Sequence, residues 1–509
     1  MEELSSNKRI VKNTLFLYIR MIAVLVVSLY TSRLILDILG VEDYGVYNVV
    51  SGIVTIFAIV NGALSAGSSR YITFALGQGD DLNLRKTFSA SFTIHTAMAV
   101  IVFILAETIG LWYVNNILVV PEGRLCAANW LYQFSIISCM LSLTQVPYGA
   151  AIVAHERMNV YAWVGLVEAL FKLVIVGLLM VTDNVDKLIM NGALLMAWSV
   201  GNQLYYRYYC LRHFKESRLM IVKERSYYSS MLSFSLWDIM GSLCVTGYAQ
   251  GINLIINLFF GVTINAARGV AIQVENAVAR FTDSFMTAVN PQIVKLYAAG
   301  AYDKMFSLVN ASSKYSFILF FMLNLPVFLK ADYLLDIWLK EVPEYTTILL
   351  QCMIVSRMTR AAARPVVQAV HATGNIKYLN IYAGGASIIL NLPLTWVLYS
   401  LGYPPQACYY VSFAVCILCN YLELYVLRKQ IPAFSIWQYS KEVFGIGLLV
   451  CALSTIVVVI VDYVTLGMGF FSLVFVSLAS LMSCCTLTFY IAADSDTRVK
   501  IIEYIKSKI

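Results

Sequence analysis

Long apolar runs separated by short polar segments follow one another along nearly the whole chain of 509 residues. Most runs are long enough for an α-helix to cross the roughly 30 Å hydrocarbon core of a bilayer. The pattern predicts about fourteen transmembrane helices, at residues 14–38, 43–66, 87–113, 125–147, 160–182, 188–208, 231–258, 263–290, 306–329, 345–370, 378–400, 406–427, 442–463 and 468–492. We therefore expect an all-α integral membrane protein.

The composition agrees with this prediction and excludes several classes of function. The chain is 60% hydrophobic and 13% charged, whereas soluble domains carry about 25% charged residues. It contains no Walker loop, no nucleophile elbow and no carboxylate pair at catalytic spacing, so neither an enzyme nor an ATP-driven pump is expected. The scattered cysteines and histidines lack metal-ligand spacing, and no cofactor is expected. Positive loops explain the net charge of +7 without a nucleic-acid partner.

Lys and Arg residues outside the predicted helices gather on one side of the membrane. With a cytoplasmic N-terminus, the outer loops hold four of them, Arg124, Lys187, Lys330 and Lys340. All the others between helices fall on the inner side, including a group in the long loop after the sixth helix. Positive residues concentrate in cytoplasmic loops of membrane proteins. The distribution therefore predicts a multi-pass protein with both termini in the cytoplasm.

The two halves of the chain show a weak internal repeat. Gly40 and Gly261 lie 221 residues apart, as do Gly79 and Gly300, and each pair sits in a similar local sequence. Halves of six helices each are related by an axis along the membrane normal. We therefore expect two parallel six-helix lobes around a central cavity, plus two C-terminal helices. The predicted divisions are an N-terminal lobe at 1–210, a cytoplasmic linker at 211–230, a C-terminal lobe at 231–428, and two extra helices with a cytoplasmic tail at 429–509.

Several cations lie inside the apolar runs, where a charge at the bilayer centre costs roughly 3 kcal/mol or more. Such side chains normally face the protein interior or a watery cavity. They are Arg20, Arg33, Lys172, Arg268, Arg280, Lys314, Arg357, Arg360 and Arg364.

Three of these cations form what we call the basic stripe: Arg357, Arg360 and Arg364. At about 100° per residue they fall within about 60° of one another around a helix. Guanidinium groups bind phosphate bidentately and stay charged when desolvated, so the stripe is a candidate anion site. Alternatively, these arginines pair with carboxylates elsewhere in the bundle, or Arg364 reaches the cytoplasmic edge. Arg20 lies deep in the first helix without a local acid and is a further candidate.

The predicted helix at 263–290 carries Arg268, Glu275, Arg280 and Asp283. Two local ion pairs would satisfy all four charges, because residues three or seven apart share one side of a helix. Binding of a ligand is the alternative, and in either case such a polar helix is expected to line a cavity.

Glu275 and Asp283, together with other membrane charges, are candidates for ion coupling or for simple pairing. Glu168 and Lys172 lie four residues apart in one helix and form either an inert pair or a coupling element. Asp238, Glu107 and Glu423 are isolated acids that could each carry a coupling proton.

The sequence resembles the Wzx-like polysaccharide flippases of the multidrug/oligosaccharidyl-lipid/polysaccharide exporter superfamily. The similarity covers residues 10–430 and is carried mainly by helix ends and loops. The segments that carry it are Thr31-Ser32-Arg33, Leu39-Gly40-Val41-Glu42-Asp43-Tyr44-Gly45-Val46-Tyr47, Ser69-Arg70, Leu76-Gly77-Gln78-Gly79-Asp80, Val146-Pro147-Tyr148, Ala154-His155-Glu156-Arg157-Met158, Ile337-Trp338-Leu339 and Val342-Pro343-Glu344-Tyr345.

The resemblance implies alternating access between two lobes around a cationic cavity. The expected substrate is an undecaprenyl-pyrophosphate-linked oligosaccharide, moved from the inner to the outer leaflet of the bacterial inner membrane for surface-polysaccharide (lipopolysaccharide, O-antigen) synthesis. Related peptidoglycan-precursor flippases use arginines in the first, second and eighth spans. Arg20 and Arg268 match two of these, but the second span here has none, which argues against a peptidoglycan precursor. The expected substrate-binding residues are Arg20, Arg268, Arg280, Arg357, Arg360 and Arg364.

Two other functions compete with this hypothesis. One is an H+- or Na+-coupled multidrug exporter of the same superfamily, for which the basic excess is unfavourable because its usual substrates are cations. The other is a membrane scaffold that organises glycosyltransferases. The expected partners are the lipid-linked oligosaccharide, membrane lipids, H+ or Na+, and a polysaccharide polymerase or glycosyltransferases.

Overall fold

Helices are the only regular secondary structure in the part of the chain that the computed structural model describes, which is residues 2–55, 58–116, 123–182, 185–339, 342–493 and 498. Within these ranges the side chains of residues 2–12, 28–29, 32–33, 36, 41–42, 44–45, 48–49, 51–55, 58–60, 262 and 266 are not described. The predicted cation Arg33 therefore lies outside the described side chains.

The helices follow one another as α1 (Glu2–Thr55), α2 (Ala58–Gln78), α3 (Asp81–Leu105), the π-helix η1 (Ala106–Gly110), α4 (Leu111–Asn116), α5 (Leu125–Ala154), α6 (Met158–Val181), α7 (Lys187–His213), η2 (Lys215–Ser217), α8 (Arg225–Ala298), α9 (Tyr302–Leu329), α10 (Ala331–Trp338), α11 (Thr346–Thr373), α12 (Lys377–Leu379), η3 (Asn380–Gly384), α13 (Gly385–Ser400), α14 (Ala407–Gln430), α15 (Ile436–Ser440), η4 (Lys441–Gly445), α16 (Ile446–Val464), α17 (Phe470–Leu487) and η5 (Thr488–Ala492).

The predicted all-α membrane architecture is confirmed. Nine helical segments of the described part are long and apolar enough to cross a membrane. Neither α7 nor α11 is among them, nor is the part of α8 that follows Gly261, because these helices are interrupted by polar and charged side chains. The total of fourteen spans stays a prediction.

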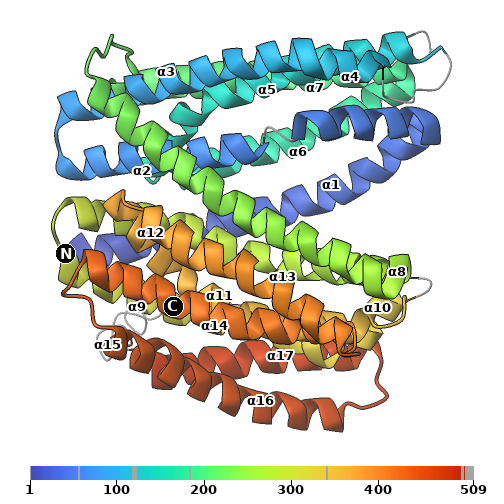
Figure 1. Ribbon diagram of the computed structural model, residues 1–509, viewed down its shortest axis with the longest axis vertical. Coiled ribbons are helices and arrows are strands. Elements are labelled where there is room, and N and C mark those ends of the chain that lie inside the picture. The colour runs from blue at the N-terminus through green and yellow to red at the C-terminus, as the bar shows by residue number, and fades with distance from the viewer. Residues whose placement is uncertain are drawn as a thin grey trace, which may run out of the picture. The chain divides into compact units, whose positions relative to one another are not determined.

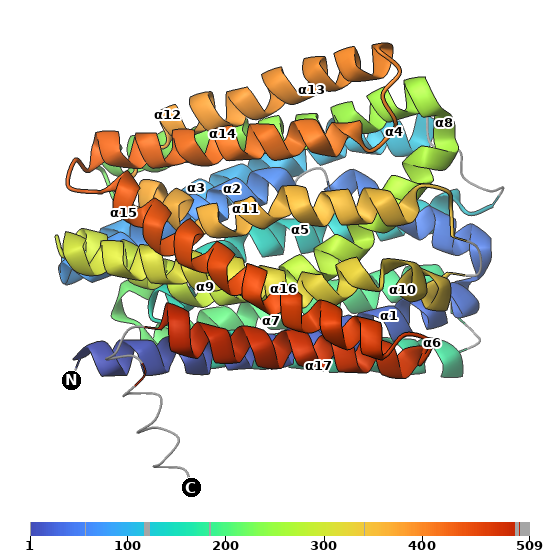
Figure 2. The same ribbon diagram turned by 90° about the horizontal axis from the view of Figure 1, so that it is seen from below.

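The chain divides into two compact units, Met1–Ile239 and Met240–Ile509. In the first unit α1 packs against α6, and α5 packs against α2, α3 and α7 (Figure 1). In the second unit α11 packs against α9 and α14, while α16 and α17 run side by side along α9 (Figure 2). The boundary between the units falls inside α8. The finer predicted divisions at 210, 230 and 428 stay predictions.

Two glycines bend the longest helices at corresponding places. Gly40 in α1 has φ 76° and ψ 169°, and Gly261 in α8 has φ 79° and ψ −171°. This backbone region is essentially restricted to glycine, because a Cβ collides with the flanking peptide groups. The turn glycines of the same repeat, Gly79 and Gly300, also share positive φ values of 74° and 68°. The weak sequence repeat therefore corresponds to a repeated backbone conformation.

Several helices run beyond the predicted spans at their predicted cytoplasmic ends. The helix predicted at 125–147 ends at Ala154, the one at 188–208 ends at His213, and the one at 263–290 ends at Ala298. Hydropathy marks where the bilayer ends, whereas backbone hydrogen bonds continue the helix into water. The helix ends therefore lie beyond the last apolar residue.

Hydrogen bonds and an ion pair hold much of the predicted linker against α3 of the first unit. Arg85 donates to the carbonyl oxygen of Arg218 at 2.7 Å, and Lys86 forms an ion pair with Glu224 at 2.6 Å. The hydrogen bond from Lys86 holds the pKa of Glu224 below its ordinary value. Tyr227, at the start of α8, donates to Asn83 at 2.8 Å. This segment therefore packs as part of the first unit, and α8 already begins within the predicted linker.

The kink at Gly261 is testable with a matched pair of glycine variants. Gly261→Ala is expected to destabilise the protein by about 1–3 kcal/mol, because alanine is strained at that φ and ψ. Gly269→Ala is the matched control, because Gly269 lies in the same helix without a positive φ. An added Cβ meets no atom within 4 Å at either glycine. The control is expected to be neutral or stabilising by up to about 1 kcal/mol. Equal thermal midpoints for the two purified variants in detergent would contradict the conclusion that the backbone at Gly261 requires glycine.

Candidate functional site

Each arginine of the basic stripe contacts a carboxylate from another helix segment of the second unit. Arg357 Nη1 lies 3.5 Å from Glu275 Oε2. Arg360 donates to Glu423 of α14, and Arg364 pairs with Asp283 of α8. The alternative that the sequence left open, pairing with carboxylates elsewhere in the bundle, is therefore the arrangement that the structure shows.

The pairs are asymmetric in burial. Glu275 and Glu423 have side chains only 1% and 2% exposed, while Arg357 and Arg360 are 49% and 40% exposed. The carboxylates thus form the inner members, and the arginines reach them from the accessible side. Arg357 makes only a loose contact with one of its nitrogens, so most of its five N–H donors stay available to another acceptor.

The local ion pairs that the sequence left open for the eighth span are not the pairs that the structure shows. Glu275 contacts Arg357 rather than Arg268, and Asp283 contacts Arg364 rather than Arg280. Charges on neighbouring helices come closer here than charges along one helix. The contacts between residues 275 and 357 and between residues 283 and 364 advance together, so α8 after Gly261 and α11 run parallel with their charged side chains opposite one another.

The remaining arginines of α8 have different surroundings. Arg268 is 4% exposed and donates to Asn253 across the kink at Gly261. Arg280 has an exposed side chain. Along 262–290, α11 and α14 up to residue 427, the five arginines Arg268, Arg280, Arg357, Arg360 and Arg364 outnumber the carboxylates Glu275, Asp283 and Glu423 by two. This part of the second unit therefore has a cationic excess.

The first unit contains the other predicted residues. Arg20 lies over the ring of Tyr161, with its guanidinium carbon 4.3 Å from the ring centroid. It also crosses α6 at Gly165, where an added Cβ would collide with the Arg20 side chain. Glu168 and Lys172 pair with each other at 2.9 Å along α6. Asp238 is half-buried near the end of the unit.

The acids predicted to be isolated have interaction partners in the structure. Glu423 accepts from Arg360, and Glu107 accepts from Gln133 at 3.2 Å. Sequence reasoning missed the first partner because residues 63 positions apart carry no local pattern that joins them. The only sequence signal was that Glu423 is an isolated acid in an apolar stretch, while Arg360 belongs to a stripe of arginines without a local acid.

Sequence reasoning also missed an ion-pair clamp next to the predicted outer helix ends. Arg124 pairs with Asp43 of α1 and with Asp186, which it reaches at 2.5 Å. Asp186 also caps α7 by accepting from the backbone N–H groups of Leu188 and Ile189. Burial alone would raise the pKa of Asp186, but the hydrogen bonds from Arg124 and from the helix hold that pKa below its ordinary value. The clamp joins α1, α5 and α7.

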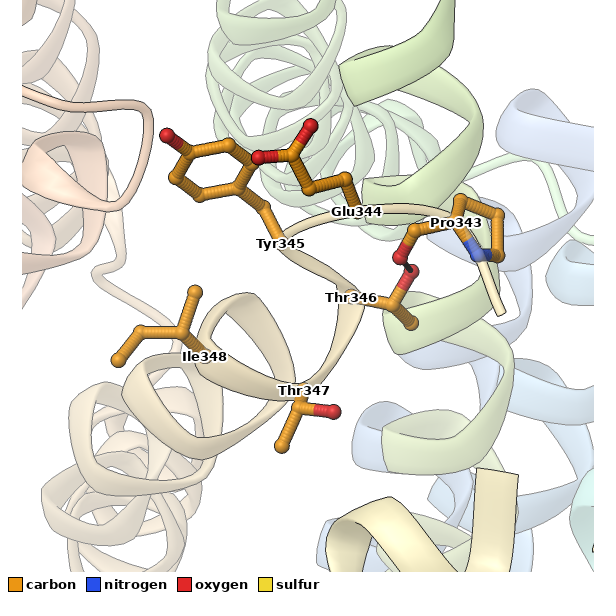
Figure 3. A pocket seen from close by; sticks show the side chains of 6 residues that line it. All are labelled: Pro343, Glu344, Tyr345, Thr346, Thr347 and Ile348. Carbon is orange, nitrogen blue, oxygen red and sulfur yellow. Dashed lines mark hydrogen bonds between the residues drawn. The ribbon is translucent and has the colours of Figure 1, made fainter. Parts of the chain in front are cut away.

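A shallow surface hollow of about 380 Å³ lies at the start of α11. It is lined by residues 343–348, and the Thr346 hydroxyl donates to the carbonyl oxygen of Pro343 at 2.6 Å (Figure 3). Tyr345 there adopts a left-handed φ of 68°. The hollow contains none of the predicted site residues.

No group of three or more His, Cys, Asp or Glu side chains in the described part of the chain is arranged to hold a metal ion. All eleven cysteines carry free thiols.

At the level of sequence, no family description and no curated protein matches the chain. Solved structures do match. An outward-facing multidrug resistance MATE family transporter of the MOP superfamily superposes with a TM-score of 0.71 at 12% identity, covering 84% of this chain and 96% of the other. The MATE transporter ClbM in complex with Rb+ gives 0.70 at 12% identity, with 84% and 96% covered. A variant of the Vibrio cholerae MATE transporter VcmN gives 0.67 at 13% identity, with 85% and 99% covered.

At such low identity these likenesses establish the fold. The chain has the fold of the MATE transporters of the MOP superfamily.

The pairing of Arg360 with buried Glu423 makes a stability prediction. Arg360→Ala is expected to cost about 3 kcal/mol, at the lower end for a broken buried pair because Arg360 is partly exposed. Replacing both residues by leucine should restore most of the loss, because no buried charge is then left unpaired.

The control is Arg364→Ala, whose partner Asp283 is 46% exposed. It should cost less than about 1 kcal/mol. The measurement is the thermal midpoint of each purified variant. Equal decreases of the midpoint for Arg360→Ala and Arg364→Ala would show that burial of the carboxylate does not determine the loss of stability.

Proposed function

We propose that this chain moves undecaprenyl-pyrophosphate-linked oligosaccharide repeat units across the bacterial inner membrane for surface-polysaccharide synthesis. The observation that carries the proposal is the cationic excess along residues 262–290, α11 and α14 up to residue 427, where five arginines accompany three carboxylates. A transporter of cations needs the opposite balance. The proposal includes an inner-membrane location with both termini in the cytoplasm, and contacts with a polysaccharide polymerase or glycosyltransferases.

A pyrophosphate group suits the arginines that are most accessible. Arg357 is half-exposed and only loosely engaged by Glu275, and Arg280 is exposed. Guanidinium binds two phosphate oxygens at once through parallel N–H donors. Charge-assisted hydrogen bonds of this kind contribute about 1.5–3 kcal/mol each. Either arginine would therefore hold a phosphate group while leaving the sugars and the lipid chain unbound.

The carboxylates favour release of the bound substrate. Glu275 and Asp283 compete with the phosphate for the same guanidinium groups, so an arginine that loses the substrate regains a partner rather than staying unpaired in a low dielectric. Binding must be strong enough for entry and weak enough for exit on the other side. Alternating access between two lobes, the transport mode proposed here, needs such a reversible site.

An ion-coupled multidrug exporter is the second candidate. It is favoured by the solved structures of the same fold, which include a multidrug resistance transporter. The basic excess weighs against it, because the acids that would attract a cationic drug are engaged by arginines. Raised susceptibility of a deletion strain to cationic dyes, reversed by the gene, would support this candidate.

Replacing the accessible arginines should block export of the glycan. In a deletion strain, complete repeat units should accumulate on undecaprenyl lipid in the inner leaflet, where an impermeant label does not reach them. Wild-type protein should relieve this accumulation. Arg280→Ala combined with Arg357→Ala should export at least about tenfold less, because two charge-assisted contacts are lost.

The matched control is Arg280→Lys combined with Arg357→Lys, which keeps both charges but loses bidentate geometry, and should retain intermediate export. Membrane levels of all variants are compared by immunoblot. If the alanine variant is present in the membrane at the wild-type level and exports the glycan as the wild type does, the assignment of Arg280 and Arg357 to the substrate site is wrong. Intact surface glycan without accumulation in the deletion strain would favour the multidrug candidate.

A further inference from the structure

The segment that joins α7 to α8 has an excess of positive charge. Residues 212–225, which we call the basic linker, contain five cations and two acids. The side chains of all five cations are exposed, and they are Arg212, Lys215, Arg218, Lys223 and Arg225. Like charges this close repel one another, so a partner that carries negative charge would stabilise this surface.

Both acids of the basic linker are engaged by other parts of the first unit. Glu216 is 5% exposed, and its carboxylate lies 2.6 Å from the Nε2 atom of His155 at the end of α5. Glu224 forms an ion pair with Lys86 of α3 at 2.6 Å. Among the described residues, no carboxylate forms an ion pair with any of the five cations. Their charge is therefore available to a partner outside the chain.

The backbone of the basic linker is held against the start of α3. The short helix η2 packs on α3 (Figure 1). The backbone N–H of Met220 donates to the hydroxyl of Ser89 at 3.0 Å, and Arg85 donates to the carbonyl oxygen of Arg218 at 2.7 Å. The cations thus project from a backbone that already has its hydrogen bonds. Binding of a partner would not have to order this segment first, which lowers the entropic cost of association.

Apolar side chains project from the same charged surface. Ile221 is 87% exposed, while its neighbour Val222 is 7% exposed, and Leu219 is 43% exposed. Ile221 lies outside the predicted spans at 188–208 and 231–258, so contact with the hydrocarbon core does not explain its exposure. A single exposed apolar side chain is common on proteins. Two of them among basic residues are typical of segments that lie in the headgroup region of a membrane.

The neighbours of the basic linker lie at the predicted edge of the bilayer. Ser89, which accepts from Met220, is near the start of the predicted span at 87–113. Tyr208 ends the predicted span at 188–208, is 61% exposed, and accepts from Arg212 at 2.9 Å through its hydroxyl. Tyrosine is enriched where membrane helices cross the interface. Charge, apolar side chains and depth therefore all agree with contact to lipid headgroups.

We propose that the basic linker is a docking surface for anionic phospholipid headgroups of the membrane that holds the protein. Lys215, Arg218 and Lys223 contact the phosphates, and Ile221 enters the interfacial region between them. A membrane surface presents many phosphates in one plane and can therefore contact several of these cations at once. Clusters of four to eight basic residues beside a membrane helix bind anionic lipids in this way. The surface goes beyond the proposed function, because the transported molecule does not enter the argument.

The first test titrates phosphatidylglycerol or phosphatidylcholine into the purified full chain in detergent and follows the thermal midpoint. Only phosphatidylglycerol should raise the midpoint of the wild type. Lys215→Gln combined with Arg218→Gln and Lys223→Gln should need at least about tenfold more of it, because each cation near an anionic surface contributes about fivefold in affinity. Lys215→Arg combined with Arg218→Lys and Lys223→Arg keeps the three charges and should respond as the wild type does.

The matched control removes three exposed cations from the predicted cytoplasmic side of the second unit. Lys304→Gln combined with Arg428→Gln and Lys441→Gln changes the net charge by the same amount and should respond to phosphatidylglycerol as the wild type does. If this control loses as much affinity as the linker variant, net charge rather than the basic linker binds the lipid, and the proposal is wrong. Inorganic phosphate is the second control. A full response to it at the same phosphate concentration would indicate a site for soluble anions and would also overturn the proposal.

The second test measures whether residue 221 enters the membrane interface. Ile221→Cys carries a thiol-linked fluorophore that is sensitive to polarity, in a chain whose exposed cysteines, Cys126 and Cys485, are replaced by serine. The signal of the same chain without Ile221→Cys is subtracted. Emission should shift to the blue in nanodiscs with phosphatidylglycerol relative to phosphatidylcholine alone, and the three glutamine substitutions should abolish the shift.

Two results overturn the proposal in these experiments. One is a wild type whose thermal midpoint responds equally to the two lipids or to neither, which would leave the surface to a soluble acidic partner. The other is a label at residue 221 whose emission is the same in both kinds of nanodisc. Neither experiment contains an oligosaccharide substrate, so failure of the proposed function would not affect their outcome.

Discussion

A charge inside a membrane helix must lie close to an opposite charge or to water, and this requirement governs the second unit. Isolated charges are costly there because the bilayer supplies neither counter-ions nor hydrogen bonds. The arginines of α11 meet carboxylates from α8 and α14, so the same contacts that neutralise the charges also fix how these helices pack. Glu275 and Glu423 are buried at these contacts, and their partners mark the accessible side of the unit.

The polar helices of the second unit are compatible with a membrane protein, because their charges take part in these ion pairs. Both α11 and the part of α8 after Gly261 are too polar to qualify as membrane spans by composition. They contain most of the charges that pair within the second unit. Their polarity is accommodated because neighbouring helices cover the carboxylates, and apolar helices such as α16 provide surface that lipid can contact. Low hydropathy between strongly apolar helices thus marks a helix whose charges are paired within the protein.

Much of the fold was predictable because its causes are local. Apolar length predicts the nine strongly apolar helical segments of the described part, and the isolated glycines at 40 and 261 mark breaks that only glycine allows. Helix ends were predicted too early because hydropathy reports the membrane boundary and not the last hydrogen bond. The ion pairs were not predictable, since Arg360 and Glu423 meet through packing of separate helices. Spacing rules for charges along one helix suggested Arg268 with Glu275, and tertiary packing overrode that suggestion.

The ion pairs leave two arginines over along residues 262–290, α11 and α14 up to residue 427. The three carboxylates of these segments each pair with an arginine of the basic stripe, so the surplus positive charge resides on Arg268 and Arg280. Arg268 is buried against Asn253, whereas Arg280 is exposed. Burial therefore separates an arginine that fixes the packing around the kink from one that an anion can reach.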